Sequence, residues 1–386
     1  MASDYALGAD SKKSRQLVER IQELLRKNGG WISFAEYMSQ VLYAPGIGYY
    51  ANNDQQLGGD FVTAPEISPL FGRCLARLVA PLLETLEGQG AVLEVGAGSG
   101  VLAAELLASL ADQDRLPDRY LILDLSAELR ERQRMTLAQR VPHLLGRVGW
   151  IDDLPASPWR GVVVANELLD ALPVERFRLT EQGPVWLGVG WKESGFCWQE
   201  QAITSPVVVP PWLASLGESL APGYTSELAL AAPAWVRSMG ERLAQGAILL
   251  VDYGYPRGEY YHPQRHDGTL ACYYRHHYHD NPLILPGLQD ITAHVEWTGV
   301  AEAALEVGLM VAGYTNQAQF LLDAGLPALL AKAAERADDK GLSLANQVRR
   351  LTLPQEMGEL FKAMLLTRGI EGRWPGFRGR DFRDRL

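Results

Sequence analysis

Short apolar runs alternate with helix-forming stretches through the middle of the chain. Runs with the length and apolar character of a buried strand lie at 91–95, 119–123, 146–149, 160–165 and 247–251. Most of them are followed by a stretch in which apolar residues recur at helical spacing. Strands that alternate with helices are typical of a parallel sheet with right-handed crossovers. The pattern therefore predicts an α/β fold built on a mostly parallel sheet.

The regions on either side of these strands have other patterns. Helices are predicted before the first strand at 11–27, 34–42 and 68–87, with a long loop at 43–65. The last two strands, 309–315 and 361–367, lack a short crossover and are expected to form an antiparallel edge. We predict an N-terminal helical region at 1–90 and a core at 91–386, with inserts at 175–245, 254–296 and 317–356. The last insert reads as helical, and the tail at 368–386 as loose.

Composition and charge narrow the class of protein. The net charge of −10 argues against a nucleic-acid surface. The three cysteines lie far apart, so neither a disulfide framework nor a Cys-x-x-Cys zinc site is expected. No apolar run reaches membrane-spanning length. The first residues include Asp4 and Asp10 and lack a signal or transit pattern, which predicts a cytoplasmic protein.

A glycine-rich turn follows the first of the predicted strands. Gly96, Gly98 and Gly100 precede a helix that begins near Val101. Glycine lets the backbone bend sharply and approach a ligand closely, and the helix directs free N–H groups toward it. The dinucleotide-binding pattern needs its third glycine at position 101, which is valine, so that pattern fails. Gly-x-Gly-x-Gly after an acidic residue, here Glu94, instead resembles motif I of S-adenosylmethionine-dependent methyltransferases.

Four sequence blocks together resemble one family. They lie at 59–68, 93–100, 166–174, and 252–256 with 286–295. Gly-Asp-Phe-Val-Thr-Ala-Pro-Glu in the first and Asn-Glu-Leu-Leu-Asp-Ala-Leu-Pro in the third are far more specific than the glycine turn. Their order and wording resemble the MidA-like S-adenosyl-L-methionine-dependent methyltransferases, a family with a mitochondrial branch that assembles complex I and methylates an arginine. The resemblance implies a Rossmann-like class I sheet, S-adenosyl-L-methionine as cofactor, and a protein substrate such as a respiratory-complex subunit.

With this resemblance, cofactor contacts are expected along the carboxyl edge of the sheet. Asp124 ends the second strand and is expected to hold the ribose hydroxyls, although it follows Gly96 by 28 residues rather than the usual 20 or so. Thr63 and Pro65 are expected to close over the cofactor. The residues expected to bind the cofactor are Thr63, Pro65, Gly96, Ala97, Gly98, Asp124, Leu125, Ile151, Asp152 and Asn166.

The acids that follow the fourth strand are the candidates for catalysis. A carboxylate can bind a guanidinium in a bidentate manner and accept the proton that methylation releases. Glu167 and Asp170 have this chemistry and would share one side if the turn continued as a helix. Asp252 and Tyr253, which follow the fifth strand, are weaker candidates for the substrate wall. Asp170 and Asp152 could also be purely structural.

Two further questions stay open at the level of sequence. Residues 255–290 hold several tyrosines and histidines, but glycines and prolines interrupt them, so we expect a loop and no metal. That loop faces the substrate or lies on the surface. Besides a protein-arginine methyltransferase, the sequence allows a small-molecule methyltransferase or an assembly factor that binds the cofactor without turnover.

Overall fold

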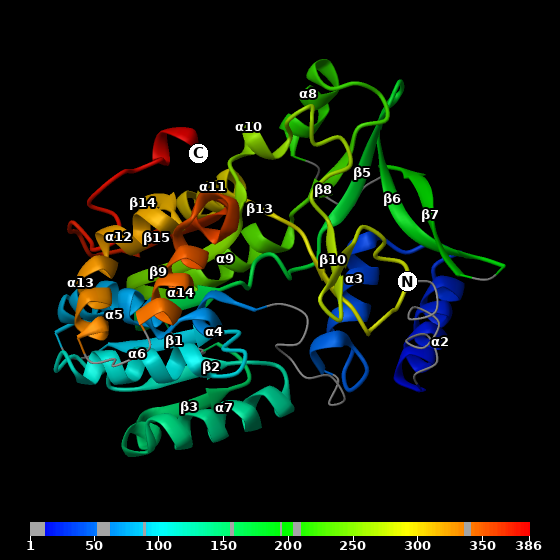
Figure 1. Cartoon of the computed structure of the whole chain (residues 1–386). Coiled ribbons are helices and arrows are strands. Elements are labelled where there is room, and N and C mark those ends of the chain that lie inside the picture. Colours follow the sequence, from blue (N-terminus) through cyan, green and yellow to red (C-terminus); the bar gives the residue numbers. More distant parts are fainter. Residues whose placement is uncertain are drawn as a thin grey trace. The chain divides into compact units, whose positions relative to one another are not determined.

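The computed structural model describes residues 12–51, 62–87, 90–154, 158–193, 195–203, 210–335 and 341–386. The chain forms two compact units (Figure 1). Unit 1 takes its described residues from Met1–Phe61, Asp170–Ala232 and Arg257–Glu296, and unit 2 from Val62–Leu169, Pro233–Pro256 and Trp297–Leu386. Most of the two inserts predicted at 175–245 and 254–296 thus belong to the same unit as the N-terminal helices.

A mostly parallel sheet forms the centre of unit 2, in the strand order β14-β15-β9-β4-β1-β2-β3. Its strands are β1 (Ala91–Val95), β2 (Tyr120–Leu123), β3 (Val148–Ile151), β4 (Trp159–Asn166), β9 (Leu243–Tyr255), β14 (Met310–Asn316) and β15 (Phe361–Arg368). From β3 to β9 all neighbouring strands are parallel. β15 runs antiparallel to both β9 and β14. The predicted mixed α/β fold and its antiparallel edge are therefore confirmed.

Several helices of unit 2, α5 and α6 among them, bury apolar residues in one core with this sheet. The helices described in this unit are α4 (Ala64–Ile67), α5 (Pro69–Glu84), α6 (Val101–Ala111), α7 (Ala127–Arg140), most of α9 (Ala231–Arg242), α11 (Trp297–Glu306), α12 (Gln317–Asp323), α13 (Leu326–Ala334) and α14 (Gly341–Thr352), with the shorter η2 (Pro142–Arg147), η3 (Pro354–Gly358) and η4 (Arg383–Arg385). Ser68 and Ser126 cap α5 and α7 through their hydroxyls. The helical insert at 317–356 is interrupted at Gly325, whose φ of 93° is left-handed.

The C-terminal tail packs on unit 2, so the prediction of a loose tail is wrong. Trp374 is 6% exposed and Phe382 is 8% exposed. The ring of Phe377 lies 5.4 Å from that of Phe320 on α12. One carboxylate oxygen of Asp323 accepts the backbone N–H groups of Gly376 at 2.7 Å and Arg378 at 2.8 Å. The segment is fixed by contacts with residues more than fifty positions away in the sequence. Its Arg- and Gly-rich composition gives no sign of these contacts.

Unit 1 combines helices with two antiparallel sheets. Its helices are α2 (Lys12–Lys27), α3 (Phe34–Tyr43), η1 (Tyr49–Ala51), α8 (Pro211–Ser219) and α10 (Arg257–Tyr260). One sheet has the order β7-β6-β5-β8, formed by β5 (Glu175–Thr180), β6 (Gly183–Lys192), β7 (Gly195–Ala202) and β8 (Thr225–Leu228). The other has the order β11-β10-β12, formed by β10 (Ala271–Tyr274), β11 (His277–His279) and β12 (Asp290–Thr292), and a short β13 (Val295–Glu296) follows. The predicted hairpin insert is confirmed as β6 and β7.

Candidate active site

The glycine turn after β1 has the conformation that only glycine adopts readily. Gly96, Gly98 and Gly100 all have left-handed φ values, of 71°, 52° and 81°. A Cβ on Gly98 would meet no atom within 4 Å among the described residues, and the residue is exposed. A Cβ on Gly100 would instead lie 3.0 Å from the Cα of Gln133 on α7. Gly98 therefore leaves room for a ligand, and Gly100 lets α7 approach the turn.

Asp124 follows β2 and is 8% exposed. Its Oδ1 accepts the backbone N–H of Ser126 at 3.0 Å, and its Oδ2 accepts the Gln133 amide at 2.8 Å. Burial raises the pKa of the Asp124 carboxyl, and these two donors oppose the shift. The neighbouring Leu125 is 81% exposed. An oriented carboxylate beside an uncovered apolar side chain suits a ligand that has both hydroxyls and an apolar ring.

Arg130 on α7 joins the ends of β2 and β3. Its guanidinium donates to the carbonyl of Asp124 at 2.6 Å and to that of Ile151 at 3.0 Å. It also forms an ion pair of 2.6 Å with Asp152, whose side chain is 90% exposed. Asp124, Ile151 and Asp152, which were predicted separately, are thus brought together by one residue that the sequence reasoning missed.

Gln133 is the second residue of α7 at these strand ends that the sequence reasoning missed. It is fully buried, its Nε2 donates to the carbonyl of Gly98 at 3.1 Å, and its Oε1 accepts the indole N–H of Trp150 at 2.8 Å. The buried residues of α7 are Leu129, Gln133 and Leu137, which follow one another at a spacing of four. A glutamine in the middle of an apolar stripe was the available signal, because buried polar side chains need partners.

The turn after β4 holds Glu167 in a left-handed conformation, with a φ of 50°. One oxygen of its carboxylate accepts the Asn166 amide and the backbone N–H of Ala64, each at 3.2 Å. The backbone N–H of Glu167 donates to the carbonyl of Val251 on β9 at 2.9 Å. Strained backbone clusters at functional sites, and Glu167 is one of seven non-glycine residues with a positive φ in the described part of the chain. The buried Oδ1 of Asn166 has no hydrogen-bond partner among the described residues.

No helix continues from Glu167. The expectation that Glu167 and Asp170 share one side of a helix is therefore wrong. Residues 167–172 form bends and turns. Asp252, only 1% exposed, holds them by accepting the backbone N–H groups of Leu168 at 3.1 Å and Leu169 at 2.9 Å. Its other oxygen accepts the N–H of Tyr253 at 2.9 Å. Asp252 thus fixes the turn that carries Glu167.

Helix α4 connects the glycine turn with the turn after β4. Thr63 precedes it, Pro65 lies in its first turn, and Ala64 donates to Glu167 as described above. The carboxylate of Glu66 accepts the hydroxyl of Ser99 in the glycine turn. Thr63 and Pro65 are therefore held near both turns. Residues 59–61 of the same sequence block lie outside the described residues.

Glu94 lies on β1, immediately before the glycine turn, and is 2% exposed. Its carboxylate accepts the hydroxyl of Tyr120 at 2.5 Å. Burial raises the pKa of Glu94 to about 7, against the effect of this hydrogen bond. A buried carboxyl group with a pKa near 7 therefore links β1 to β2 just before the glycine turn.

Unit 1 contains Asp170, which is 5% exposed and whose carbonyl accepts the N–H of Ala293 at 2.9 Å.

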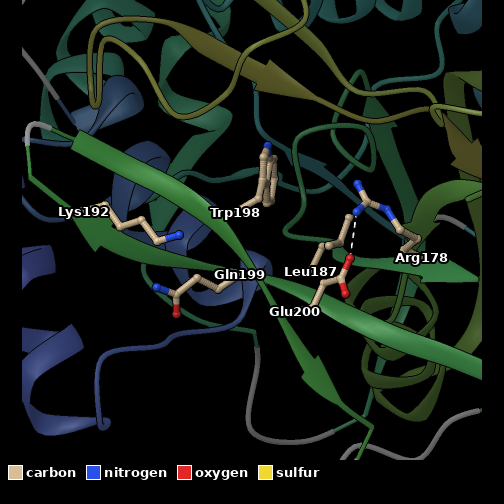
Figure 2. Close-up of a pocket in the computed structure, with 6 residues that line it drawn as sticks. All are labelled: Arg178, Leu187, Lys192, Trp198, Gln199 and Glu200. Carbon is tan, nitrogen blue, oxygen red and sulfur yellow. Dashed lines mark hydrogen bonds and ion pairs between the residues drawn. The ribbon is translucent and has the colours of Figure 1, made fainter. Parts of the chain in front are cut away.

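Unit 1 also has an open pocket of about 450 Å³ (Figure 2). Its lining residues come from β5, β6 and β7: Arg178, Leu187, Lys192, Trp198, Gln199 and Glu200. It contains none of the predicted site residues, and its charged groups include the Arg178–Glu200 ion pair of 2.7 Å. The predicted residues other than Asp170 lie instead at the strand ends of unit 2 and in the segment at Thr63 and Pro65.

Two absences hold for the part of the chain that the structure describes. It contains no group of three or more His, Cys, Asp or Glu residues that could hold a metal ion. None of its helices is long and apolar enough to cross a membrane.

Known proteins are similar to this chain in sequence, and one of them also in its solved structure. A mouse protein named "Protein arginine methyltransferase NDUFAF7, mitochondrial" is 30% identical over 92% of this chain and 86% of its own length. The human protein of that name is 28% identical over 88% of this chain and 81% of its own. A Burkholderia thailandensis protein, crystallised with bound S-adenosyl-homocysteine, is 44% identical over 97% of both chains, with a TM-score of 0.92.

These comparisons correct one prediction and confirm others. The predicted cytoplasmic location is wrong, because the curated relatives are named mitochondrial proteins. The predicted cofactor is confirmed, as is the resemblance from which it was inferred. Residues 74–315 match the family described as "Putative S-adenosyl-L-methionine-dependent methyltransferase". The chain belongs to this family and is an S-adenosyl-L-methionine-dependent methyltransferase.

Proposed function

We propose that this chain methylates an arginine side chain of a protein. The observation that carries the proposal is the carboxylate of Glu167 at the end of β4, held by Ala64 and Asn166 in a strained turn. Ligands of open α/β sheets bind at this carboxyl edge. The relatives are named protein arginine methyltransferases, which supports arginine as the acceptor. A respiratory-complex subunit is our first candidate for the substrate protein.

We further propose that the sheet of unit 2 is of the Rossmann-like class I type and that its edge binds S-adenosyl-L-methionine. The open space at Gly98 suits a ligand that approaches the backbone, with Gly96 and Ala97 beside it. Asp124 would accept the ribose hydroxyls, and Leu125 would cover the adenine. The other proposed cofactor contacts are Thr63, Pro65, Ile151, Asp152 and Asn166. The unpartnered Oδ1 of Asn166 is an acceptor suited to an ammonium group.

In the proposed mechanism the bound cofactor supplies an electrophilic methyl group on a sulfonium. Glu167 would bind the guanidinium, orient its nucleophilic nitrogen and accept the proton released as the carbon–nitrogen bond forms and the methyl–sulfur bond breaks, with S-adenosyl-homocysteine as the leaving group. Orientation of this kind supplies about 7–11 kcal/mol in favourable cases. Asp170 is the second proposed acid, and Tyr253 a proposed wall for the substrate. For Asp252 we propose a positioning role, because three backbone N–H groups already occupy its carboxylate.

Each region of the chain can be given a task in this proposed reaction. We propose that the N-terminal region, residues 1–90, contributes the segment that covers the cofactor, and that residues 91–386 hold the catalytic core. The inserts at 175–245 and 254–296 would recognise the substrate, whereas the insert at 317–356 contributes buried residues to the core of unit 2. The first two of these inserts fall largely in unit 1, which has its own core of buried apolar residues, and this supports a separate task for them.

The experiment is transfer of tritium from methyl-labelled S-adenosyl-L-methionine to the proteins of a cell lysate. We expect label in protein and, after acid hydrolysis, in methylarginine. The Glu167→Gln variant is the control for label that other enzymes transfer. Label in small molecules alone would indicate a small-molecule methyltransferase. No label, with S-adenosyl-homocysteine still bound, would indicate an assembly factor without turnover, and either result would refute the proposal.

A further inference from the structure

We propose that Gln133 is a positioning residue that orients the carboxylate of Asp124 toward the ribose of the cofactor. The proposal rests on the ribose contact of Asp124 proposed above, but not on arginine as the acceptor. Gln133 is fully buried on α7, a helix to which the sequence analysis gave no role in the site. Its side-chain amide contacts Gly98 after β1, Asp124 after β2 and Trp150 near the end of β3.

The hydrogen bonds determine which way this amide faces. The indole N–H of Trp150 is only a donor, so the group that it contacts at 2.8 Å must be the Oε1 of Gln133. The Nε2 then faces two acceptors, the carbonyl of Gly98 at 3.1 Å and the Oδ2 of Asp124 at 2.8 Å. An amide NH₂ has two hydrogens, one for each acceptor. The opposite orientation would direct Oε1 at both acceptors and the NH₂ group at the indole N–H.

The fixed amide in turn fixes the carboxylate. Gln133 holds Oδ2 of Asp124, and the backbone N–H of Ser126 holds Oδ1 at 3.0 Å. A carboxylate has about four acceptor positions, so Asp124 keeps acceptor capacity for a ribose hydroxyl beside these donors. Because the same NH₂ group also binds Gly98, Gln133 sets the spacing between the glycine turn and Asp124. A ligand with its amino-acid part at the glycine turn and its ribose at Asp124 would depend on this spacing.

Two substitutions of Gln133 test this role by calorimetric titration with S-adenosyl-homocysteine. Gln133→Glu keeps the acceptor for Trp150 but replaces the donor to Asp124 with a second acceptor. Gln133→Met keeps the length and removes all three hydrogen bonds. A hydrogen bond from a ribose hydroxyl to the charged carboxylate of Asp124 is worth about 10- to 100-fold in affinity, and a carboxylate that Gln133 no longer orients would lose it, so we expect losses of this order for both variants. The methionine variant keeps the test valid if the glutamate variant does not fold.

The matched control is Gln317, which is also fully buried in unit 2 and whose Nε2 donates to the carbonyl of Leu351 at 2.9 Å. Gln317→Glu should lower stability and leave the affinity for S-adenosyl-homocysteine unchanged. Unchanged affinity in both Gln133 variants would overturn the proposal, and so would an equal loss in the Gln317 variant.

A second ligand separates positioning of Asp124 from a general defect of the fold. The 2′-deoxy analogue of S-adenosyl-homocysteine lacks one of the hydroxyls that Asp124 would bind. We expect it to bind the wild-type protein more weakly and to lose much less affinity on substitution of Gln133. Equal losses for both ligands would mean that Gln133 does not act through the ribose. Equal wild-type affinity for the two ligands would refute the ribose contact itself, while the tritium assay tests the acceptor independently.

Discussion

Gly98 offers the sharpest test of where the cofactor binds. Gly98→Ala adds a single methyl group at a position where a Cβ meets no atom within 4 Å among the described residues. The added methyl group therefore clashes with no described residue of the protein. Its only cost to the fold is the left-handed backbone conformation. The φ of 52° is left-handed, which costs a non-glycine residue about 1–2 kcal/mol. A ligand that contacts the backbone at Gly98 would meet the methyl group directly.

Gly308 provides the matched control in unit 2. Its φ is 76°, and its Cβ would lie at an ordinary contact distance of 3.7 Å from a nitrogen of Arg368. Both alanine variants should therefore lose about 1–2 kcal/mol in the free energy of unfolding by urea. Crowding by one methyl group costs about 1–3 kcal/mol, which is about 5- to 150-fold in Kd. Calorimetry with S-adenosyl-homocysteine should show this loss for Gly98→Ala alone. If the two variants bind within about twofold of each other, the assignment of the turn is wrong.

Three other expectations follow from the acids of the site and from the tail. Glu167→Gln and Asp170→Asn should retain S-adenosyl-homocysteine binding and lose at least about 100-fold in tritium transfer, the lower end of the range for a lost acid–base group; full transfer would remove that residue from the mechanism. Burial raises the pKa of Glu94 from 4.5 to about 7, so its unfolded form ionises first and stability falls as the pH rises between these values. Glu94→Gln should remove up to about 3 kcal/mol of this fall, measured by urea unfolding at pH 5 and pH 8, and parallel pH profiles would contradict the burial argument. Trp374→Ala should lower the unfolding free energy by about 3–5 kcal/mol, against less than about 0.5 kcal/mol for the exposed Leu322→Ala, and equal effects would contradict the packed tail.

The sheet was predictable because buried parallel strands are continuous apolar runs, and the glycine turn because its conformation demands glycine. The turn after β4 was not predictable in the same way. Its local residues favour a helix, but the carboxylate of Asp252, more than eighty residues away, takes the N–H groups of Leu168 and Leu169. The packed tail escaped prediction for a similar reason, since its partner Asp323 lies far away in the sequence.

Block 166–173 illustrates why a motif and a compact unit are different things. Its residues are contiguous in the sequence, yet Glu167 belongs to unit 2 and Asp170 to unit 1. All the residues proposed to contact the cofactor belong to unit 2, where α7 connects the ends of β2 and β3 with the glycine turn. Cofactor affinity should therefore report on unit 2 alone. The proposed mechanism assigns methyl transfer to Glu167 and Asp170, so a variant of Asp170 tests whether this residue of unit 1 takes part in the reaction.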